Sequence, residues 1–392
     1  MLNTRFSPWP HFDGEQIDAV AQVLRSGRVN YWTGDNGAAF EQEFASWCGT
    51  RHAVALTNGT VALDLALHAL GIGLGDEVIV TPRTFIASVS SVVNAGARPV
   101  FADVDRDSGN LSAETIAAVL SPTTRAIVCV HLAGWPCDMG AIMDLAMSRG
   151  IAVIEDCAQA HGARWRGTPV GSIGTIGAWS FCQDKIISTG GEGGMVTTED
   201  AALYERMWSF KDHGKSREAV FECVHPPGFR WVHESFGTNW RMLEMQAAVG
   251  RIQLKRLPEW TAARTRAAER YRTVADQFPD ALRAPVPPAG DTHAYYRFYA
   301  YVSPEGLAPG WSRDRIVEEC SAKGMPLFQG SCSEVYLEKA FDGTGLRPPA
   351  PLPVARELGE TSLMFLTHPT LEDHELQEMC AIFEDVMRRA AR

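Results

Sequence analysis

Between residues 50 and 200, short Val- and Ile-rich runs alternate with stretches of helical periodicity, and this alternation constrains the fold most. We predict strands at 52–56, 77–81, 98–102, 125–131, 151–156, 176–181 and 194–197, and helices at 60–70, 86–95, 112–120 and 139–149. The strands are nearly continuous apolar runs, which is typical of a sheet buried on both faces. The pattern therefore predicts an α/β fold with a mostly parallel seven-stranded sheet and flanking helices.

The chain of 392 residues is too long for one ordinary core and suggests two domains. A helix is expected at 241–257. After the Pro-rich stretch 285–290 the pattern changes: residues 295–302 alternate like a half-exposed strand, and helices are expected at 314–323 and 373–389. We predict a large α/β domain at 1–255 and a smaller α+β domain at 256–392.

Charge and cysteine content exclude several classes of protein. The formal net charge of −11 repels nucleic acid, and the basic stretches at 264–272 and at the C-terminus are interpreted as solvated helix faces. Nine scattered cysteines without a Cys-x-x-Cys pair indicate reduced thiols. The first dozen residues lack the apolar core of a signal peptide, and no apolar run approaches the roughly 20 residues that span a bilayer. We therefore expect a cytoplasmic protein that binds neither nucleic acid nor membrane.

Ligands of parallel sheets bind beyond the carboxyl ends of the strands, so residues that follow strands are candidates for chemistry. The segment 57–60 (TNGT) precedes a predicted helix, and free N–H groups at a helix start suit a phosphate. A plain helix cap would explain the same residues. Phe85 follows the strand at 77–81 and could stack on a planar ring, although ordinary core packing is the alternative.

Two further strand ends carry charged residues. Asp156 ends the strand at 151–156, where a carboxylate could keep the pyridine nitrogen of pyridoxal 5′-phosphate (PLP) protonated, or could simply cap a helix. Lys185 follows the strand at 176–181 and precedes the Gly-rich stretch 190–194. A lysine there could form a Schiff base with a carbonyl cofactor. The alternatives are a solvated lysine and a tight turn.

In combination, these segments resemble the DegT/DnrJ/EryC1/StrS family of PLP-dependent sugar aminotransferases, within the aspartate-aminotransferase-like group of fold type I. The resemblance runs from Gly27 to Pro369. Its motifs are NGTVAL at Asn58, TPRTFIAS at Thr81, EDCAQAHGA at Glu155, SFCQDK from Ser180 with GGEGG after it, GTNWRM at Gly237, HAYYRF at His293 and THPTL at Thr367.

The resemblance implies one PLP site, with Lys185 and Asp156 as the catalytic residues. Lys185 matches the Schiff-base lysine and Asp156 the partner of the pyridine nitrogen. The other matches bind cofactor only: Gln159 at the ring hydroxyl, Phe85 stacked on the ring, Gly59, Thr60 and Ser180 around the phosphate, and Asn239 reaching the phosphate from a neighbouring subunit. The match at Asn239 implies a homodimer with shared active sites. No metal is implied.

The implied reaction moves an amino group from glutamate or glutamine to a keto-sugar, usually one carried on a nucleoside diphosphate. Lys185 would shuttle the proton as general base and then acid. Arg83 departs from the family pattern, and it could meet a sugar-nucleotide phosphate or form a surface salt bridge. Trp32, His213 and Tyr336 are candidate sugar contacts.

Three alternatives share the fold. A 3-amino-5-hydroxybenzoate synthase would tend to carry His in place of Gln159, and a sugar 3-dehydratase would carry His in place of Lys185. A non-catalytic regulator should have lost Lys185, Asp156 or the phosphate-binding residues, and this chain retains all of them.

Overall fold

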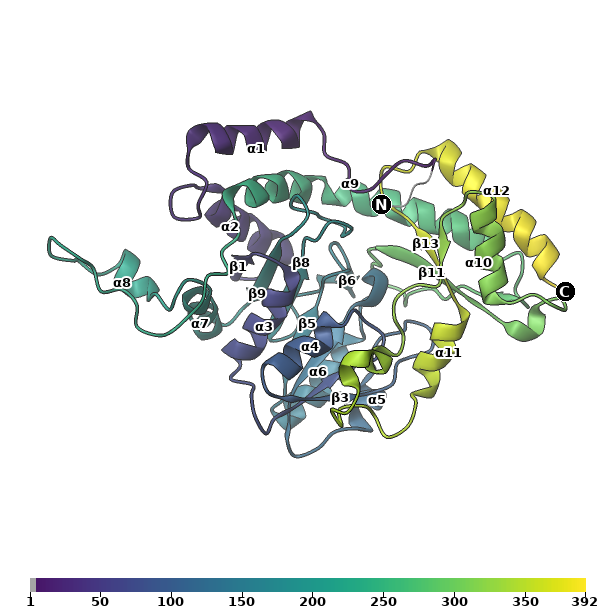
Figure 1. The fold of residues 1–392 in the computed structure, drawn as a ribbon, viewed down its shortest axis with the longest axis horizontal. Coiled ribbons are helices and arrows are strands. Elements are labelled where there is room, and N and C mark those ends of the chain that lie inside the picture. Colours follow the sequence, from purple (N-terminus) through teal and green to yellow (C-terminus); the bar gives the residue numbers. More distant parts are fainter. Residues whose placement is uncertain (1–4) are drawn as a thin grey trace.

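The structure is a computed structural model that describes residues 5–392, and two sheets organise it (Figure 1). In spatial order, the larger sheet contains β1 (His52–Leu56), β9 (Gly194–Thr198), β8 (Ile176–Ser180), β5 (Ala152–Asp156), β4 (Thr124–Val130), β2 (Glu77–Val80) and β3 (Arg98–Phe101). Only β9 runs against the others, because it pairs antiparallel with both β1 and β8 while the remaining neighbours are parallel. The predicted mostly parallel seven-stranded sheet is confirmed.

Helices cover both faces of this sheet, which explains why its strands are apolar throughout. On β2, Val78 and Val80 join the core beneath one layer of helices, whereas Ile79 joins the core on the opposite face. The first layer contains α3 (Gly59–Ala69), α4 (Ala87–Asn94) and α7 (Ala201–Lys211). The second contains α2 (Asn36–Cys48), α5 (Ala113–Ala117), α6 (Met139–Arg149) and part of α9 (Glu244–Ala275). Helix α5 is shorter than the predicted 112–120.

Helix α9 is the long connection between the two parts of the molecule, and its predicted end at Leu257 is wrong. The helix continues through Pro258 to Ala275. Leu254 and Leu257 pack into the core of the large sheet, while Tyr271 packs into the core of the small one. Burial at both ends outweighs the single hydrogen bond that a proline removes. The proposed domain division at 255–256 falls inside this helix and stays a prediction.

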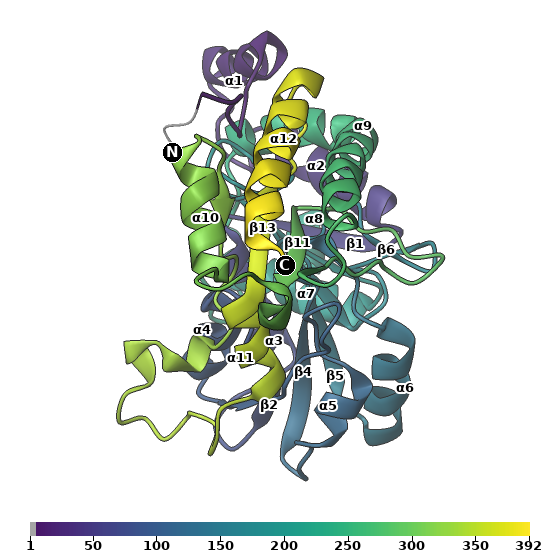
Figure 2. The same ribbon diagram turned by 90° about the vertical axis from the view of Figure 1, so that its right-hand side faces the viewer.

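The smaller sheet has the order β10 (Leu282–Arg283), β11 (Arg297–Val302), β13 (Ser362–Leu366) and β12 (Leu327–Phe328). Helices α10 (Arg313–Ala322) and α12 (Asp373–Ala390) lie side by side over it, as Figure 2 shows, and the predicted α+β architecture is confirmed. Helix α11 (Pro353–Thr361) and the short 3-10 turns η2 (Pro304–Gly306), η3 (Val335–Leu337) and η4 (Lys339–Phe341) complete the C-terminal part of the chain. A further 3-10 turn, η1 (Leu132–Gly134), follows β4 of the large sheet. Phe6, from the N-terminal segment, also packs into this core.

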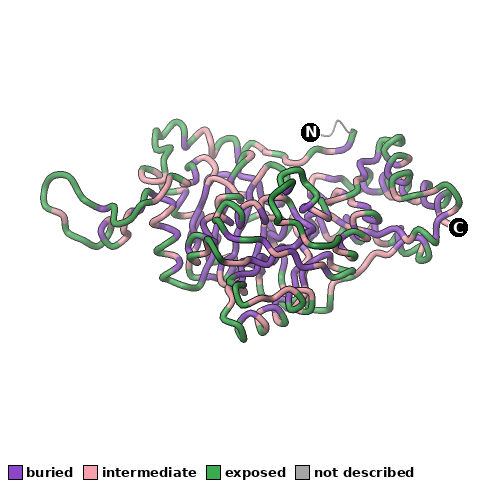
Figure 3. The backbone as a smooth tube through the Cα atoms, turned by 60° about the horizontal axis from the view of Figure 1, so that its bottom comes forward, coloured by how far each residue is buried: buried purple, intermediate pink, exposed green. Residues whose placement is uncertain are grey.

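The segment 212–240, which we call the arm, projects from the large sheet beyond α7 and contains α8 (Arg217–Phe221) (Figure 1). Most of the arm is exposed, in contrast to the buried strands (Figure 3). Helix α1 (Gly14–Ser26) packs against α9, and β6 (Arg164–Trp165) and β7 (Thr168–Pro169) form a hairpin. Within residues 5–392, no helix is long and apolar enough to cross a membrane.

Candidate active site

Four of the predicted segments follow strands whose carboxyl ends share one edge of the large sheet. Strands β1, β2, β5 and β8 all run in the same direction. Asp156, the last residue of β5, pairs with Ala178 of β8, two residues before Ser180. The fold therefore brings Asp156 and Ser180 to neighbouring strand ends, which is where ligands of such sheets bind.

Asp156 is buried and held by hydrogen bonds on both oxygens. Ser88 Oγ donates to Oδ2 at 2.7 Å, and the backbone N–H of Ala158 donates to Oδ1 at 3.1 Å. Thr84 Oγ1 lies 2.8 Å from the Ser88 hydroxyl and extends the chain of polar contacts. Burial raises the pKa of Asp156, although the Ser88 bond and the charge of Lys185 oppose this rise. A cation placed against this carboxylate would offset the cost of burial.

Gln159 lies three residues further on, and a backbone group fixes the orientation of its amide. The N–H of Ala133 donates to Gln159 Oε1 at 2.8 Å. Ala133 has φ 57° in η1, the turn that follows β4, so its N–H points back at the loop after β5. Because Oε1 is used in this way, Nε2 is the end of the amide left to donate to a ligand.

Lys185 lies in a turn after β8, and its amine is close to a carboxylate and to an aromatic ring. Its Nζ is 4.0 Å from Asp184 Oδ1 and 5.0 Å from the centre of the Tyr296 ring. Trp9 Nε1 donates to the Lys185 carbonyl oxygen at 2.9 Å. Burial acts to lower the pKa of the Lys185 amine, but Tyr296, Asp184 and Asp156 outweigh it and raise that pKa. The acidic and aromatic groups around Nζ therefore favour the charged form of the amine.

The start of α3 has the features of both a helix cap and a phosphate site, the two interpretations that the sequence left open. Asn58 caps the helix, because its Oδ1 accepts from the N–H of Val61 at 3.0 Å. The N–H groups of Gly59 and Thr60, in the first turn, have no partner within the helix. A Cβ added at Gly59 would lie 2.5 Å from Ser180 Cβ. Only glycine allows Ser180 to approach this helix start, and together they form a cradle suited to an anion.

The remaining predicted residues lie around this edge with different exposure. Phe85 is 69% exposed, so the core-packing alternative is wrong and its ring is free to stack on a ligand. Asn239 is exposed and pairs with Asp212 at the base of the arm. The carbonyl of the next residue, Trp240, accepts from the N–H of Thr57 at 3.0 Å, beside the start of α3. The role of Asn239 toward a neighbouring subunit stays a prediction.

Comparison with known proteins agrees with this geometry. The sequence profile of the DegT/DnrJ/EryC1/StrS aminotransferase family matches residues 10–384. The chain belongs to this family. An aminotransferase from Psychrobacter cryohalolentis, known from an X-ray structure, is 60% identical with a TM-score of 0.97, over 98% of this chain and 99% of that one. The protein is thus an aminotransferase, and its fold is that of the PLP-dependent enzymes of the family.

Two curated relatives show the range of chemistry within the family. The dTDP-3-amino-3,4,6-trideoxy-α-D-glucose transaminase of Streptomyces venezuelae is 37% identical, over 90% of this chain and 87% of its own length. The 3-amino-5-hydroxybenzoate synthase of Amycolatopsis mediterranei is 34% identical, over 99% and 100%. Family membership alone therefore leaves the acceptor of the amino group open.

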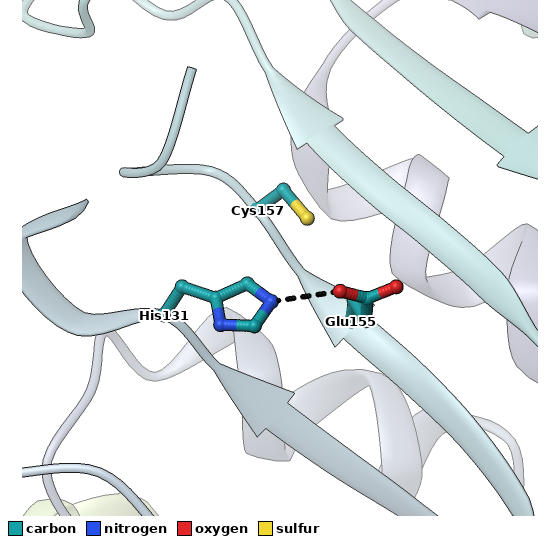
Figure 4. Close-up of side chains that lie close together, drawn as sticks. All are labelled: His131, Glu155 and Cys157. Atoms are coloured by element: carbon teal, nitrogen blue, oxygen red, sulfur yellow. Dashed lines mark hydrogen bonds and ion pairs between the residues drawn. The ribbon is translucent and has the colours of Figure 1, made fainter. Parts of the chain in front are cut away.

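A buried cluster in this aminotransferase has the composition of a metal site but not its chemistry. Ligand atoms of His131, Glu155 and Cys157 lie within 4.8 Å of one another (Figure 4). His131 Nδ1 accepts from the N–H of Cys137 at 3.0 Å, so Nε2 carries the proton and donates to Glu155 at 3.0 Å. Glu155 also accepts from the backbone N–H groups of Gly171, Ile173 and Gly174. With these atoms occupied, the cluster joins β4, β5 and the 171–174 turn behind Asp156.

Two of the suggested substrate contacts are buried elsewhere. Arg83 has no exposed surface, and its guanidinium donates to the hydroxyl groups of Ser333 and Ser362 at 2.8 and 3.1 Å. The surface salt bridge is therefore wrong, and the same burial argues against contact with a sugar-nucleotide phosphate. Tyr336 is also buried, and its hydroxyl donates to Glu334 Oε1 at 2.6 Å. Arg83 therefore fastens the loop at 331–337 to the end of β2, whereas the ring of Tyr336 packs against Phe101 of β3.

The other two suggested contacts stay candidates. Trp32 is half-buried and has the Lys215 ammonium 4.0 Å from its ring centre. His213 is exposed in the arm. Sequence reasoning missed Ser88, although it ends the TPRTFIAS motif and lies one helical turn after Thr84. It also missed Trp9, for which the sequence gives no signal.

Proposed function

We propose that this aminotransferase holds PLP on Lys185 and moves an amino group from glutamate or glutamine to a keto-sugar carried on a nucleoside diphosphate. The observation that carries the proposal is the pairing of β5 with β8. It brings the carboxylate of Asp156 beside the strand that leads to Lys185, at the ligand-binding edge of the sheet.

The residues at this edge fit the chemical groups of PLP one by one. The cradle of Gly59 and Ser180 at the start of α3 suits its phosphate. The exposed ring of Phe85 offers a stacking surface, and Nε2 of Gln159 is the donor left for the ring hydroxyl. Asp156, whose pKa burial has raised, gains a cationic partner if it faces a protonated pyridine nitrogen.

When bound, PLP would act as the electron sink for carbanion chemistry at the amino-acid Cα. Lys185 would hold the cofactor and, once displaced by the donor, move a proton at its Nζ as base and then as acid. Asp156 would keep the pyridine nitrogen protonated, with Ser88 and the Ala158 N–H holding the carboxylate in place. Gln159 would orient the ring.

The acceptor is inferred from the relatives and from one residue. The Streptomyces venezuelae transaminase, named for a dTDP-linked amino sugar, supports a nucleotide-linked acceptor. The Amycolatopsis mediterranei relative favours aromatic amine formation as the second candidate. We favour the sugar because this chain carries Gln159 where the aminohydroxybenzoate branch is expected to carry His. We also infer that the reaction takes place in the cytoplasm.

The first test is cofactor uptake and trapping. We expect the purified protein to take up PLP with visible absorption that changes when glutamate is added, and borohydride to fix the cofactor to the peptide containing Lys185. Lys185→Ala should lower turnover by roughly 10²- to 10⁴-fold or more, whereas Lys255→Ala, an exposed lysine on α9, should have no effect.

A protein that takes up no PLP, or a Lys185→Ala variant with robust turnover, would overturn the proposal. A panel of nucleotide-linked keto-sugars, assayed beside 3-amino-5-hydroxybenzoate formation, separates the two acceptors.

A further inference from the structure

The indole ring of Trp9 lies against the turn that carries Lys185. Its Nε1 donates to the Lys185 carbonyl oxygen at 2.9 Å, across 176 positions of sequence. The same ring makes an edge contact with Trp260 of α9, with ring centres 5.2 Å apart, and has the Arg264 guanidinium 5.3 Å from its centre. Trp9 thus joins the Lys185 turn to the middle of the long helix.

The segment around Trp9 is anchored independently of Lys185. Thr370 Oγ1 donates to the Pro8 carbonyl oxygen at 2.8 Å, and the N–H of Ser7 donates to Glu375 Oε1 at 2.6 Å. The Trp9 ring also stacks on His368, with ring centres 6.3 Å apart. Residues 6–9, which we call the strap, are therefore fixed to the C-terminal part of the chain before Trp9 reaches the turn.

The turn is held from its other side by a second set of contacts. Tyr296 donates a hydrogen bond to Asp184, and Arg297 Nη2 lies 3.6 Å from the same carboxylate. Asp184 and Lys185 are adjacent, so the side chain of one and the backbone of the other are both fastened. Backbone held at two points leaves only the Lys185 side-chain torsions free, which is what a precisely directed amine requires.

We propose that Trp9 is a positioning residue for the active-site lysine: its hydrogen bond to the Lys185 carbonyl sets the place of the turn and hence the reach of Nζ. The inference rests on the proposed function of Lys185. Without the indole N–H, the carbonyl loses a fixed partner and the turn moves more freely. Such a change costs turnover through misplacement of Nζ and leaves substrate affinity nearly unchanged.

The test compares Trp9→Phe with Trp260→Phe, which makes the same chemical change in the same aromatic cluster but removes no bond to Lys185. In the cofactor-free protein, we expect amide hydrogen exchange in the peptide around 182–189 to become roughly fivefold faster in Trp9→Phe only. In the PLP-loaded enzyme, the rate of borohydride trapping and kcat should fall roughly tenfold. KM for glutamate should stay within roughly twofold of wild type.

Because Trp9→Phe also removes ring surface, a second variant replaces Trp9 with benzothienylalanine, which keeps the shape and lacks only the N–H. We expect it to reproduce the faster exchange and slower trapping. Unchanged exchange in this variant, or equal losses in Trp260→Phe, would overturn the positioning role. Because hydrogen exchange is measured without PLP, it tests the Trp9 contact independently of the cofactor. Failure of the wild-type protein to trap PLP would instead count against the proposed function.

Discussion

At the scale of single residues, the state of Asp156 depends on the hydroxyl group of Ser88. Burial raises the pKa of this carboxyl, and the Ser88 hydrogen bond is the largest influence that lowers it, followed by the Ala158 N–H and the charges of Lys185 and His131. Because this pKa is raised, protonation of the carboxylate begins at a higher pH than for an ordinary aspartate as the pH falls. The ionised carboxylate that would pair with a protonated pyridine nitrogen is therefore lost on the acid side of the pH range.

We predict that Ser88→Ala raises the pKa of Asp156 further, so that the acid limb of activity moves to higher pH. PLP affinity at pH 6 should fall roughly tenfold, because a hydrogen bond to a charged group is lost, and should recover partly at pH 8. Fluorescence titration with PLP across this range is the measurement. Ser91→Ala is the matched control: Ser91 is buried on the same helix, and its hydroxyl has no partner among residues 5–392. Equal effects of the two variants would refute the role of Ser88.

At the scale of elements, the first turn of α3 differs from that of α1 in what surrounds it. Both helices begin with glycine after a capping side chain, Asn58 for α3 and Asp13 for α1. A Cβ at Gly59 would meet Ser180, whereas a Cβ at Gly14 would meet nothing within 4 Å. The glycine of α3 is therefore required by packing, and that of α1 is not.

We predict that Gly59→Ala lowers the free energy of unfolding by about 1–3 kcal/mol and weakens PLP binding roughly tenfold or more, because the cradle must open. Gly14→Ala should stabilise the protein by about 0.5–1 kcal/mol and leave PLP binding unchanged. Denaturant unfolding and PLP titration measure both effects. If Gly59→Ala bound PLP with wild-type affinity, the assignment of Ser180 and the start of α3 to the phosphate site would be wrong.

At the scale of the whole molecule, the arm carries apolar side chains that a monomer would leave in water. Phe236 is fully exposed, and four others are at least half exposed: Phe221, Val224, Phe229 and Trp231. Large apolar side chains that are exposed together on one projecting segment are typical of a surface that binds another protein. Because Asn239 lies at the base of the arm, we propose that these side chains bind a second copy of the chain, in the homodimer that the family match at Asn239 implies.

We predict that analytical ultracentrifugation gives a molar mass of about twice the 42.9 kDa of one chain. The double substitution of Trp231→Asp and Phe236→Asp should shift it to the monomer and lower activity, because charges replace the apolar contact. Met147→Asp, an equally drastic change at a position of α6 that is 70% exposed, should keep the dimer. A monomeric wild type, or a dimeric double variant, would contradict the proposal.

The sequence by itself determined which segments are strands and which residues follow them. Asp156 and Lys185 became candidates because apolar runs end at or shortly before them, and parallel topology gathers strand ends at one edge of the sheet. The resemblance to the family then singled out their roles over those of a helix cap and a solvated lysine. The cap at Asn58 is local in the same sense, since the capping side chain and the Val61 N–H that it accepts from are three residues apart.

Only the tertiary structure decided the contacts that join distant parts of the chain. Helix α9 continues past Pro258 because two separate cores bury its two halves, which no local preference reveals. Arg83 is buried between β2 and a loop 250 residues away, and Trp9 reaches Lys185 across 176 positions. Sequence periodicity reports which face of an element is apolar, but not which distant donor meets which acceptor, because that pairing exists only once the elements have packed.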